Sequence, residues 1–175
     1  LKSIREKKPE AVVMVGMPGS RKSSWAWDFK GRNPVLSIDA HIERMSFEEG
    51  LSYADGYDKF YKLAFAAFRQ DIDQYRADQK PFIWDQVNIT RAERDLIFRM
   101  LSPTHSVTYV CFFVPVEECL RRAYEREQGG GVAVNEPRIR KLAAIAEFPS
   151  TKSGERYDRF VRLTHPDWNK RMARA

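Results

Sequence analysis

The stretch AVVMVGMPGSRKSSWA, residues 11–26, decides the fold of this chain. It opens with a short apolar run, residues 11–15, that ends at Gly16, and this pattern is typical of a buried parallel strand. Residues 23–31 then favour a helix that stops at Gly31. The stretch therefore predicts a strand, a glycine-rich loop and a helix in succession.

The loop between this strand and this helix fits the phosphate-binding pattern G-x-x-x-x-G-K-[ST] with one exception. Gly16, Lys22 and Ser23 fall in register, whereas Arg21 occupies the place of the second glycine. In such a P-loop, backbone N–H groups at the helix N-terminus bind phosphate, the lysine reaches the β- and γ-phosphates, and the hydroxyl binds Mg²⁺. We expect Arg21 to be tolerated if its backbone is helical, because a left-handed φ favours glycine.

The P-loop predicts ATP and Mg²⁺ as cofactors, with Ser23 as a metal ligand and Lys22 acting in catalysis. The alternative is a glycine-rich turn that precedes a Lys-Ser pair by chance. The loop residues expected to hold the nucleotide are Gly16, Pro18, Gly19, Ser20, Arg21, Lys22, Ser23 and Ser24.

The rest of the chain alternates strands with helices. Strands are expected at residues 34–39, 81–85, 106–114 and, at the edge of the sheet, 156–163, and helices at 90–101, 116–127 and 136–148. This alternation predicts an α/β fold: a three-layer, P-loop kinase-type parallel sheet with helices on both faces and a helical lid. We expect a single domain over residues 1–175, with the lid near 121–138 and a basic C-terminal tail near 164–175.

A further helix is expected from Gly56 onward. Its apolar residues recur at helical spacing, which favours core packing over a platform for base stacking. These residues are Phe60, Leu63, Ala64, Ala67, Phe68, Ile72 and Tyr75.

Composition limits the class of protein. A chain that is 43% hydrophobic and 31% charged is globular, and no apolar run approaches the ~18 residues that span a membrane. We therefore expect no membrane partner and an intracellular, cytoplasmic location. Cys111 and Cys119 lack the spacing of a metal site and are expected to be core thiols. The net charge of +6 makes a polyanionic partner plausible without distinguishing nucleic acid from a small phosphorylated substrate.

Two acidic residues follow predicted strands. Asp39 ends the strand at 34–39 and Asp85 ends the strand at 81–85, so both are expected at the same sheet edge as the P-loop. A carboxylate there can accept a proton from an attacking hydroxyl or hold Mg²⁺ through water. The alternative for each is a helix cap or a solvated turn.

Four segments together resemble a known family: GMPGSRKSSWAWDF, SID, WDQVNITRAER and VPVEECLRRAYERE. In order and spacing they are similar to the kinase domain of the bacteriophage polynucleotide 5'-kinases, over residues 11–148. The resemblance implies that Asp39 is the general base and that Lys22 and Ser23 act in the P-loop. It also implies that Arg122 and Arg126 of the lid contact the donor phosphates, and their i,i+4 spacing independently places both on one helix face. Arg126 is accordingly counted among the catalytic residues.

The chain departs from that family at several points. The family carries an arginine three residues after the base to grip the acceptor, whereas this chain has Ile42 there. His41 and Arg44 are candidates to replace it. We expect the run of glycines at 129–131 to lengthen the lid, and we expect no phosphatase domain of the kind that some members of the family carry. These differences leave the acceptor open.

Other polar residues after the strand at 81–85 are candidates for the acceptor site. Asp85 and Asn88 are assigned to substrate binding. Arg91 and Arg94 could also face the substrate, although a charged surface helix is the favoured interpretation for both.

The sequence thus predicts an ATP-dependent kinase that moves the γ-phosphoryl group to a hydroxyl of nucleic acid, DNA in preference to RNA, at the 5'-end. One alternative is a kinase of a hydroxymethylated DNA base such as 5-hydroxymethyluracil, and another is a nucleoside or metabolite kinase. A binding module that uses ATP without transferring phosphate is the alternative outside enzymes. The protein could be phage-encoded and act in the host cytoplasm.

Overall fold

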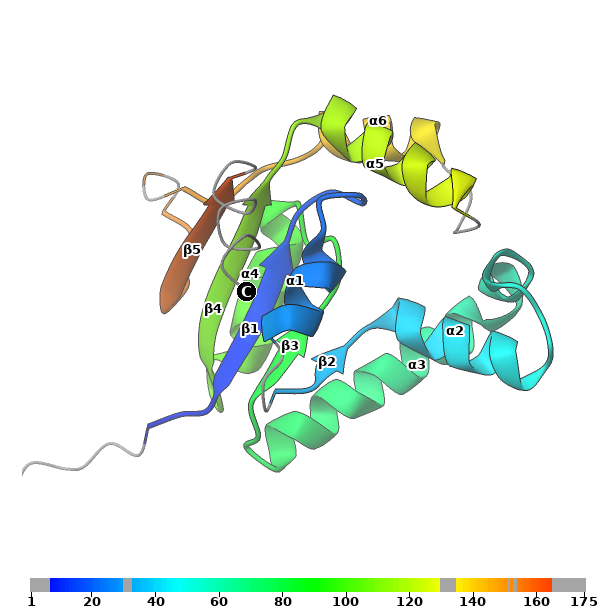
Figure 1. The fold of residues 1–175 in the computed structure, drawn as a ribbon. Coiled ribbons are helices and arrows are strands. Elements are labelled where there is room, and N and C mark those ends of the chain that lie inside the picture. Colours follow the sequence, from blue (N-terminus) through cyan, green and yellow to red (C-terminus); the bar gives the residue numbers. More distant parts are fainter. Residues whose placement is uncertain (1–6, 30–32, 130–134, 151, 153, 165–175) are drawn as a thin grey trace, which may run out of the picture.

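A five-stranded parallel sheet forms the centre of the described part of the chain, in the order β2-β3-β1-β4-β5 (Figure 1). The computed structural model describes residues 7–29, 33–129, 135–150, 152 and 154–164. The strands are β1 (Glu10–Val15), β2 (Val35–Leu36), β3 (Phe82–Trp84), β4 (Ser106–Phe113) and β5 (Arg159–Thr164). The α/β fold class is confirmed, as is the edge position of the last strand.

Helices connect these parallel strands, because a parallel pair cannot be joined by a tight hairpin. They are α1 (Lys22–Phe29), α2 (Ile38–Glu48), α3 (Tyr53–Ala77), α4 (Arg91–Leu101), α5 (Val116–Gln128) and α6 (Glu136–Ala144). Thr90 and Glu93 have the sequence spacing of a capping box, and this capping box is present at the start of α4. The expected helix stop at Gly31, the glycines at 130–131 and the tail at 165–175 lie outside the described residues.

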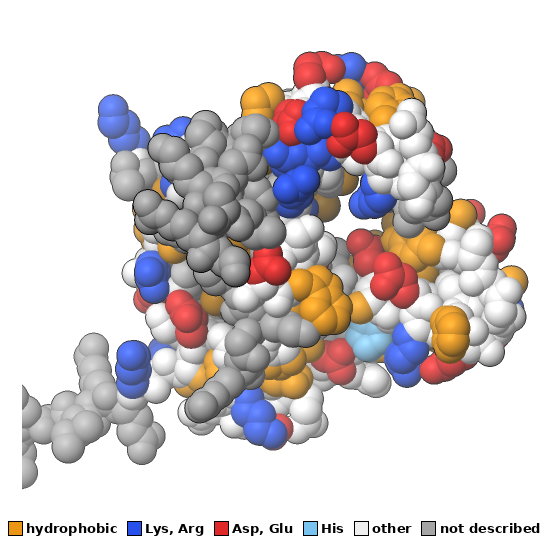
Figure 2. Space-filling model, in the orientation of Figure 1, with side chains coloured by type: hydrophobic (Ala, Val, Ile, Leu, Met, Phe, Trp, Pro, Cys, Tyr) orange, Lys and Arg blue, Asp and Glu red, His pale blue; other side chains and the backbone are white. Residues whose placement is uncertain are grey.

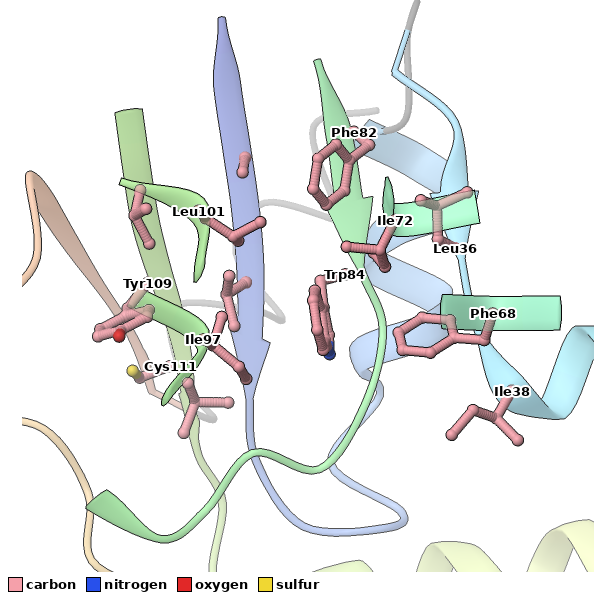
Figure 3. Packing of buried hydrophobic residues seen from close by; sticks show 14 of the residues in the cluster. Leu36, Ile38, Phe68, Ile72, Phe82, Trp84, Ile97, Leu101, Tyr109 and Cys111 are labelled. Atoms are coloured by element: carbon pink, nitrogen blue, oxygen red, sulfur yellow. The ribbon is translucent and has the colours of Figure 1, made fainter. Parts of the chain in front are cut away.

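Alternate residues of β1 pack on opposite faces of the sheet, as the period of two requires. Val13 joins the larger core cluster, to which α2, α3 and α4 contribute, whereas Met14 joins a second cluster with Trp25 of α1. Figure 3 shows three residues of the larger cluster: Phe68 and Ile72 from α3, and Ile97 from α4. Helices therefore cover both faces of the sheet.

The predicted strand at 34–39 is wrong beyond Leu36. Ser37 is the N-cap of α2 and its side chain accepts a hydrogen bond from the Ala40 backbone N–H at 3.4 Å. Asp39 consequently lies in the first turn of α2, where a negative charge interacts favourably with the helix dipole. Asp39 is the second residue of α2, so it still lies close to the carboxyl end of β2.

The helix expected from Gly56 is confirmed as α3, but one of its predicted core residues is wrong. Phe60, Ala64 and Phe68 follow one another at four-residue intervals and are buried against the sheet. Leu63 is 60% exposed because it lies on the flank away from that line.

A close approach between α2 and α3 fixes the start of α3. A Cβ atom on Gly56 would lie 1.8 Å from the Ser46 hydroxyl oxygen, so only glycine allows this contact. Ile42 of α2 is completely buried in the same region of the core. Close packing between α2 and α3 therefore fixes the position of the helix that carries Asp39.

Arg94 corrects the expectation of a charged surface helix. Its side chain is completely buried and forms an ion pair with Glu155, with 2.6 Å between Arg94 Nε and Glu155 Oε1. The guanidinium also donates to the backbone oxygens of Asn88 and Glu147. Arg94 thus ties α4 to the segment before β5 and cannot contact a substrate. Neither α4 nor any other helix in the described ranges is both long and apolar enough to cross a membrane.

Candidate active site

The P-loop connects β1 to α1 and is held by its own backbone. The Gly16 N–H donates to the Val87 carbonyl at 3.0 Å, which anchors the loop to the segment after β3. The Lys22 ammonium donates to the carbonyl oxygens of Gly16 at 2.9 Å and Met17 at 3.0 Å. Burial lowers the pKa of Lys22, and the nearby Asp85 carboxylate opposes that shift. A buried ammonium is therefore fixed at the loop, where a bound phosphate would complete its coordination.

The tip of the loop packs closely on α5. Gly19 has a φ of 82°, and a Cβ atom there would lie 2.4 Å from the Cys119 carbonyl oxygen. Met17 also belongs to a cluster with Leu120 of α5 and Ile139 of α6. The loop and the α5-α6 pair are thus packed together.

Arg21 does not have the helical backbone that we expected of it. Its φ is 67°, in the left-handed region that favours glycine, and α1 begins at the next residue. Its carbonyl accepts the first hydrogen bond of the helix, from the Trp25 N–H at 3.0 Å. An arginine in this conformation costs about 1–2 kcal/mol relative to glycine.

A hydroxyl and a carboxylate meet beside the loop. The Ser23 hydroxyl donates to Asp85 Oδ2 at 2.8 Å. Burial raises the pKa of Asp85, while Lys22 and the Ser23 hydrogen bond act in the opposite direction. Among the described residues no group of three or more His, Cys, Asp or Glu side chains could hold a metal. One hydroxyl with a carboxylate nearby suits Mg²⁺, which keeps several of its waters. Ser23 and Asp85 thus have the donor chemistry that could hold Mg²⁺, and the acceptor contact assigned to Asp85 from the sequence stays a prediction.

The remaining predicted P-loop residues differ in their exposure to solvent. Ser24 is exposed next to Ser23 in the first turn of α1, and Pro18 is half-buried. Ser20 is buried, and its N–H donates to the Met17 carbonyl at 3.1 Å. Ser20 thus shapes the turn.

Asp39 faces the same site from α2. It is exposed, and its Oδ1 accepts a hydrogen bond from the Tyr53 hydroxyl at 2.8 Å. The Asp39 charge raises the pKa of both Lys22 and Asp85, as a smaller contribution than burial, so the three groups share one electrostatic environment. Burial, with Asp39, raises the pKa of Tyr53, and the phenol stays protonated as a donor.

His41 and Arg44 lie on the outer part of α2. His41 Nε2 is 2.7 Å from Asp71 Oδ2 of α3, and its Nδ1 is 3.3 Å from an Arg44 nitrogen. Arg44 is exposed and also lies 3.9 Å from Glu48. His41 therefore links the two helices, whereas Arg44 is the more accessible of the two. Ile42 points into the core between them, so the position at which the resembling family carries an arginine cannot grip an acceptor here.

Asn88 lies in the segment that follows β3 and is tied to β1. Its side chain is buried, and its Nδ2 donates to the Met14 carbonyl at 2.8 Å. The residue has a φ of 47°, which asparagine tolerates better than most residues. Asn88 thus fastens the segment after β3 to β1, and its assignment to substrate binding stays a prediction.

The two α5 arginines that were predicted to contact the donor phosphates differ. The Arg122 side chain is 8% exposed and its Nε donates to Glu118 Oε1 at 2.7 Å. Arg126 is exposed one turn further along, and its side chain forms no hydrogen bond or ion pair with the residues that the structure describes. Because Cys119 packs on the loop, Arg122 lies one turn from that contact. Arg126 is the arginine available for a ligand.

A hollow separates the two helical pairs. Figure 2 shows it between the α5-α6 pair and the α2-α3 pair, with basic side chains on the first border and acidic side chains on the second. Tyr53, which donates a hydrogen bond to Asp39, belongs to the candidate active site and was not predicted from the sequence. The only signal for it was the four-residue spacing of aromatic residues at 53, 57, 61 and 65.

The geometry agrees with what comparison with known proteins shows. A sequence profile of the family AAA_33, an AAA domain, matches residues 12–149. The chain belongs to this family. No curated protein sequence matches the chain.

Solved structures share the fold of this AAA domain at low sequence identity. A candidate kinase from Chloroflexus aurantiacus J-10-fl has a TM-score of 0.66 and 13% identity, over 97% of this chain and 98% of the other. A gluconokinase from Sinorhizobium meliloti 1021 has a TM-score of 0.57 and 16% identity, over 90% and 83%. A chain of the Pnkp1/Rnl/Hen1 RNA repair complex has a TM-score of 0.61 and 20% identity, over 87% of this chain and 53% of that one.

These neighbours establish a kinase-like P-loop fold. Together with the family match they support the prediction of an ATP-dependent kinase. This AAA domain spans about half of the RNA-repair chain. Its substrate therefore depends on the acceptor side of the site.

Proposed function

We propose that this AAA domain is an ATP-dependent kinase that transfers the γ-phosphoryl group to a hydroxyl of nucleic acid, at a 5'-end. The observation that carries the proposal is the position of Asp39. An exposed carboxylate with one oxygen fixed by Tyr53 faces the buried Lys22 and the Ser23-Asp85 pair. That arrangement separates a group that can accept a proton from groups that can hold phosphate and metal.

The residues of the loop fit ATP and Mg²⁺. Lys22 would bind phosphate oxygens, Ser23 would be the direct protein ligand of the metal, and Asp85 would hold metal-bound water. When bound, the magnesium-nucleotide complex supplies the phosphoryl group to be transferred and screens its charge.

Asp39 Oδ2 accepts the proton of the acceptor hydroxyl. Tyr53 holds Oδ1, which leaves Oδ2 without a hydrogen-bond partner among the described residues. As the proton moves to Asp39, the acceptor oxygen forms its bond to the γ-phosphorus, and the bond from that phosphorus to the β-γ bridging oxygen breaks. Lys22 and Arg126 stabilise the negative charge on the transferred oxygens.

Charge and likeness support nucleic acid as the acceptor. The chain has a net charge of +6, which favours a polyanion. A neighbour with the same fold comes from an RNA repair complex. Both cysteines are buried and free, as is usual for a protein of the reducing cytoplasm, where the enzyme would act. DNA is the preferred nucleic acid of this proposal.

A second candidate keeps the chemistry and changes the acceptor. Ile42 is buried, so the site lacks the arginine that would grip the end of a strand. A hydroxymethyl group on a flipped DNA base would need no such grip. A sugar or other small metabolite, as acted on by the gluconokinase neighbour, would need none either.

One labelling experiment distinguishes these acceptors. The protein, Mg²⁺ and γ-labelled ATP are mixed in parallel with a 5'-hydroxyl oligonucleotide, a 5'-blocked oligonucleotide, a 5'-blocked duplex with internal hydroxymethyluracil, and gluconate. Label on the 5'-hydroxyl oligonucleotide alone supports the proposal. Label on the modified duplex or on gluconate would show that the acceptor is the hydroxymethylated base or a small metabolite instead of the 5'-end. Absence of label everywhere, with ATP still bound, would indicate a binding module.

A further inference from the structure

Four aromatic side chains form a continuous ladder along α3. Tyr53, Tyr57, Tyr61 and Phe65 are spaced by four residues, and successive ring centroids are 5.9, 5.4 and 6.5 Å apart. This aromatic ladder is distinct from the line of Phe60 and Phe68, which packs on the sheet.

The ladder runs from the candidate active site toward solvent. Its first ring, Tyr53, donates its hydroxyl to Asp39. Tyr57 is half-buried, and the later rings are open, with Tyr61 41% and Phe65 45% exposed. Four residues advance a helix by about 400°, so a row at this spacing turns gradually from the core-facing side to the outer side. An acceptor that reaches Asp39 would therefore have its continuation directed along these rings.

Basic groups accompany the ladder. The Arg138 guanidinium of α6 lies 5.9 Å from the centre of the Tyr57 ring, and it donates to the Tyr57 hydroxyl at 3.4 Å. Lys62 and Arg69 follow Tyr61 and Phe65 on the exposed side of α3, and neither forms an ion pair within the described ranges. Open rings flanked by unpaired cations are the combination that binds single-stranded nucleic acid, because rings stack on bases while cations meet the phosphates.

We propose that the aromatic ladder binds the nucleotides next to the reacting end of a single-stranded nucleic acid. This inference rests on the proposed function and deepens it by giving the acceptor a binding surface. The rings are about 6 Å apart along the helix axis, whereas stacked bases rise only about 3.4 Å per step. Each ring therefore receives one base of an unstacked strand, and a duplex does not fit.

The test uses the double variant Tyr61→Ala/Phe65→Ala, with Leu63→Ala as the matched control. Leu63 is an exposed apolar residue of the same helix that lies off the ladder. Both are compared with the wild type for binding of a 3'-fluorescein-labelled, 5'-hydroxyl decanucleotide, and for the KM of that oligonucleotide. We expect the double variant to weaken binding at least tenfold and to raise KM, with the loss in KM rather than kcat. Leu63→Ala should bind as the wild type does.

An abasic oligonucleotide sharpens the test. Removing the bases at positions 2–4 should weaken binding to the wild type but add little to the loss in the double variant, because each change removes the same stacking. Equal losses in both proteins would overturn the ladder. An unchanged affinity of the double variant would overturn it too. If the wild type proves to be a dimer in light scattering and such a double variant is a monomer, the rings are instead a contact between two copies of the chain.

Binding and labelling together separate the two proposals. If the wild type labels the oligonucleotide but the double variant matches Leu63→Ala, the ladder is wrong and the kinase stands. If no label is transferred but the double variant still loses binding, the ladder stands and the proposed reaction is wrong. If the wild type neither labels nor binds the oligonucleotide, both are overturned.

Discussion

The two sides of the candidate active site are built differently. On the donor side, defined by Lys22, Ser23 and Asp85, the ammonium is buried and hydrogen-bonded to the loop, and burial shifts the pKa of both charged groups. On the acceptor side, defined by the α2-α3 pair with Asp39 and Arg44, the charged groups are exposed.

This difference separates what the fold determines from what can vary. Phosphate and magnesium are the same for every kinase of this fold, so their ligands can be preorganised by packing at a cost in stability. An acceptor differs from one enzyme to the next, and its groups lie on a helical pair joined to the sheet at one edge. Perturbing the donor side should therefore weaken binding or transfer of the phosphoryl group for any acceptor, whereas perturbing the acceptor side should alter how the acceptor is used.

The largest effect on the donor side is expected for Lys22→Met. Loss of the ammonium should lower the rate of phosphoryl transfer about 10²–10³-fold and abolish the rise in Tm that ATP and Mg²⁺ produce. Without nucleotide, Tm should change little. Burial lowers the Lys22 pKa, so the charged form opposes folding at neutral pH, and its removal offsets two lost hydrogen bonds.

Lys80→Met is the control, because Lys80 is exposed and paired with Asp78. It should retain both turnover and the response to nucleotide. Turnover of Lys22→Met within tenfold of the wild type would show that the donor side is not where we place it.

Gly19→Ala should be the next largest effect. Its Cβ would collide with the Cys119 carbonyl, and its φ is positive, so we expect a loss of about 3 kcal/mol or more in the free energy of unfolding. Gly50→Ala is the matched control, because Gly50 has a φ of 68° and no atom within 4 Å of the added Cβ. It should cost only about 1 kcal/mol. Equal losses in urea titrations would mean that α5 does not pack on the loop.

Asp85→Asn should reduce transfer about 10–100-fold by weakening the hold on Mg²⁺. It should also change the pH dependence of stability. Burial raises the folded-state pKa of Asp85 above 3.8, so the folded state binds this proton more tightly than the unfolded state does. The wild type therefore loses stability as pH rises from 3.8 through the raised pKa.

The Asp85→Asn variant should lack that loss and be at least as stable as the wild type at neutral pH. Thermal unfolding between pH 4 and 8 measures this. A variant that is less stable at neutral pH would indicate that the ionised carboxylate supports the fold.

The smallest effect is expected for Arg21→Gly, which should stabilise the fold by about 1 kcal/mol because glycine accepts the left-handed φ. Gln79→Gly, at a φ of 51° beyond the end of α3, should give a similar gain. If Arg21→Gly instead destabilises the protein while Gln79→Gly stabilises it, the arginine side chain contributes contacts that offset its backbone cost.

Sequence reasoning succeeded where the signal is local. The P-loop, the capping box at Thr90 and the alternation of strands and helices are contiguous patterns, and they gave the fold. It failed where the structure depends on distant partners. The Ser23-Asp85 hydrogen bond joins residues 62 positions apart, and burial of Arg94 requires Glu155, 61 positions away.

Local ambiguity explains the remaining errors. The segment before Asp39 resembles a continuing strand, and only the capping bond of Ser37 ends it. Leu63 fits the helical spacing of the apolar residues, but the buried line of α3 runs through Phe60 and Ala64, and Leu63 lies beside it.

The most direct test of the account is the steady-state rate of Asp39→Asn with γ-labelled ATP and a 5'-hydroxyl oligonucleotide. Asparagine keeps the size of the side chain and its bond from Tyr53 but cannot take the proton. The account predicts a fall in kcat of about 10²–10⁴-fold with little change in the KM for ATP. A kcat within a few-fold of the wild type would contradict it, because Asp39 would then not be the base and the acceptor would not lie on the α2-α3 side.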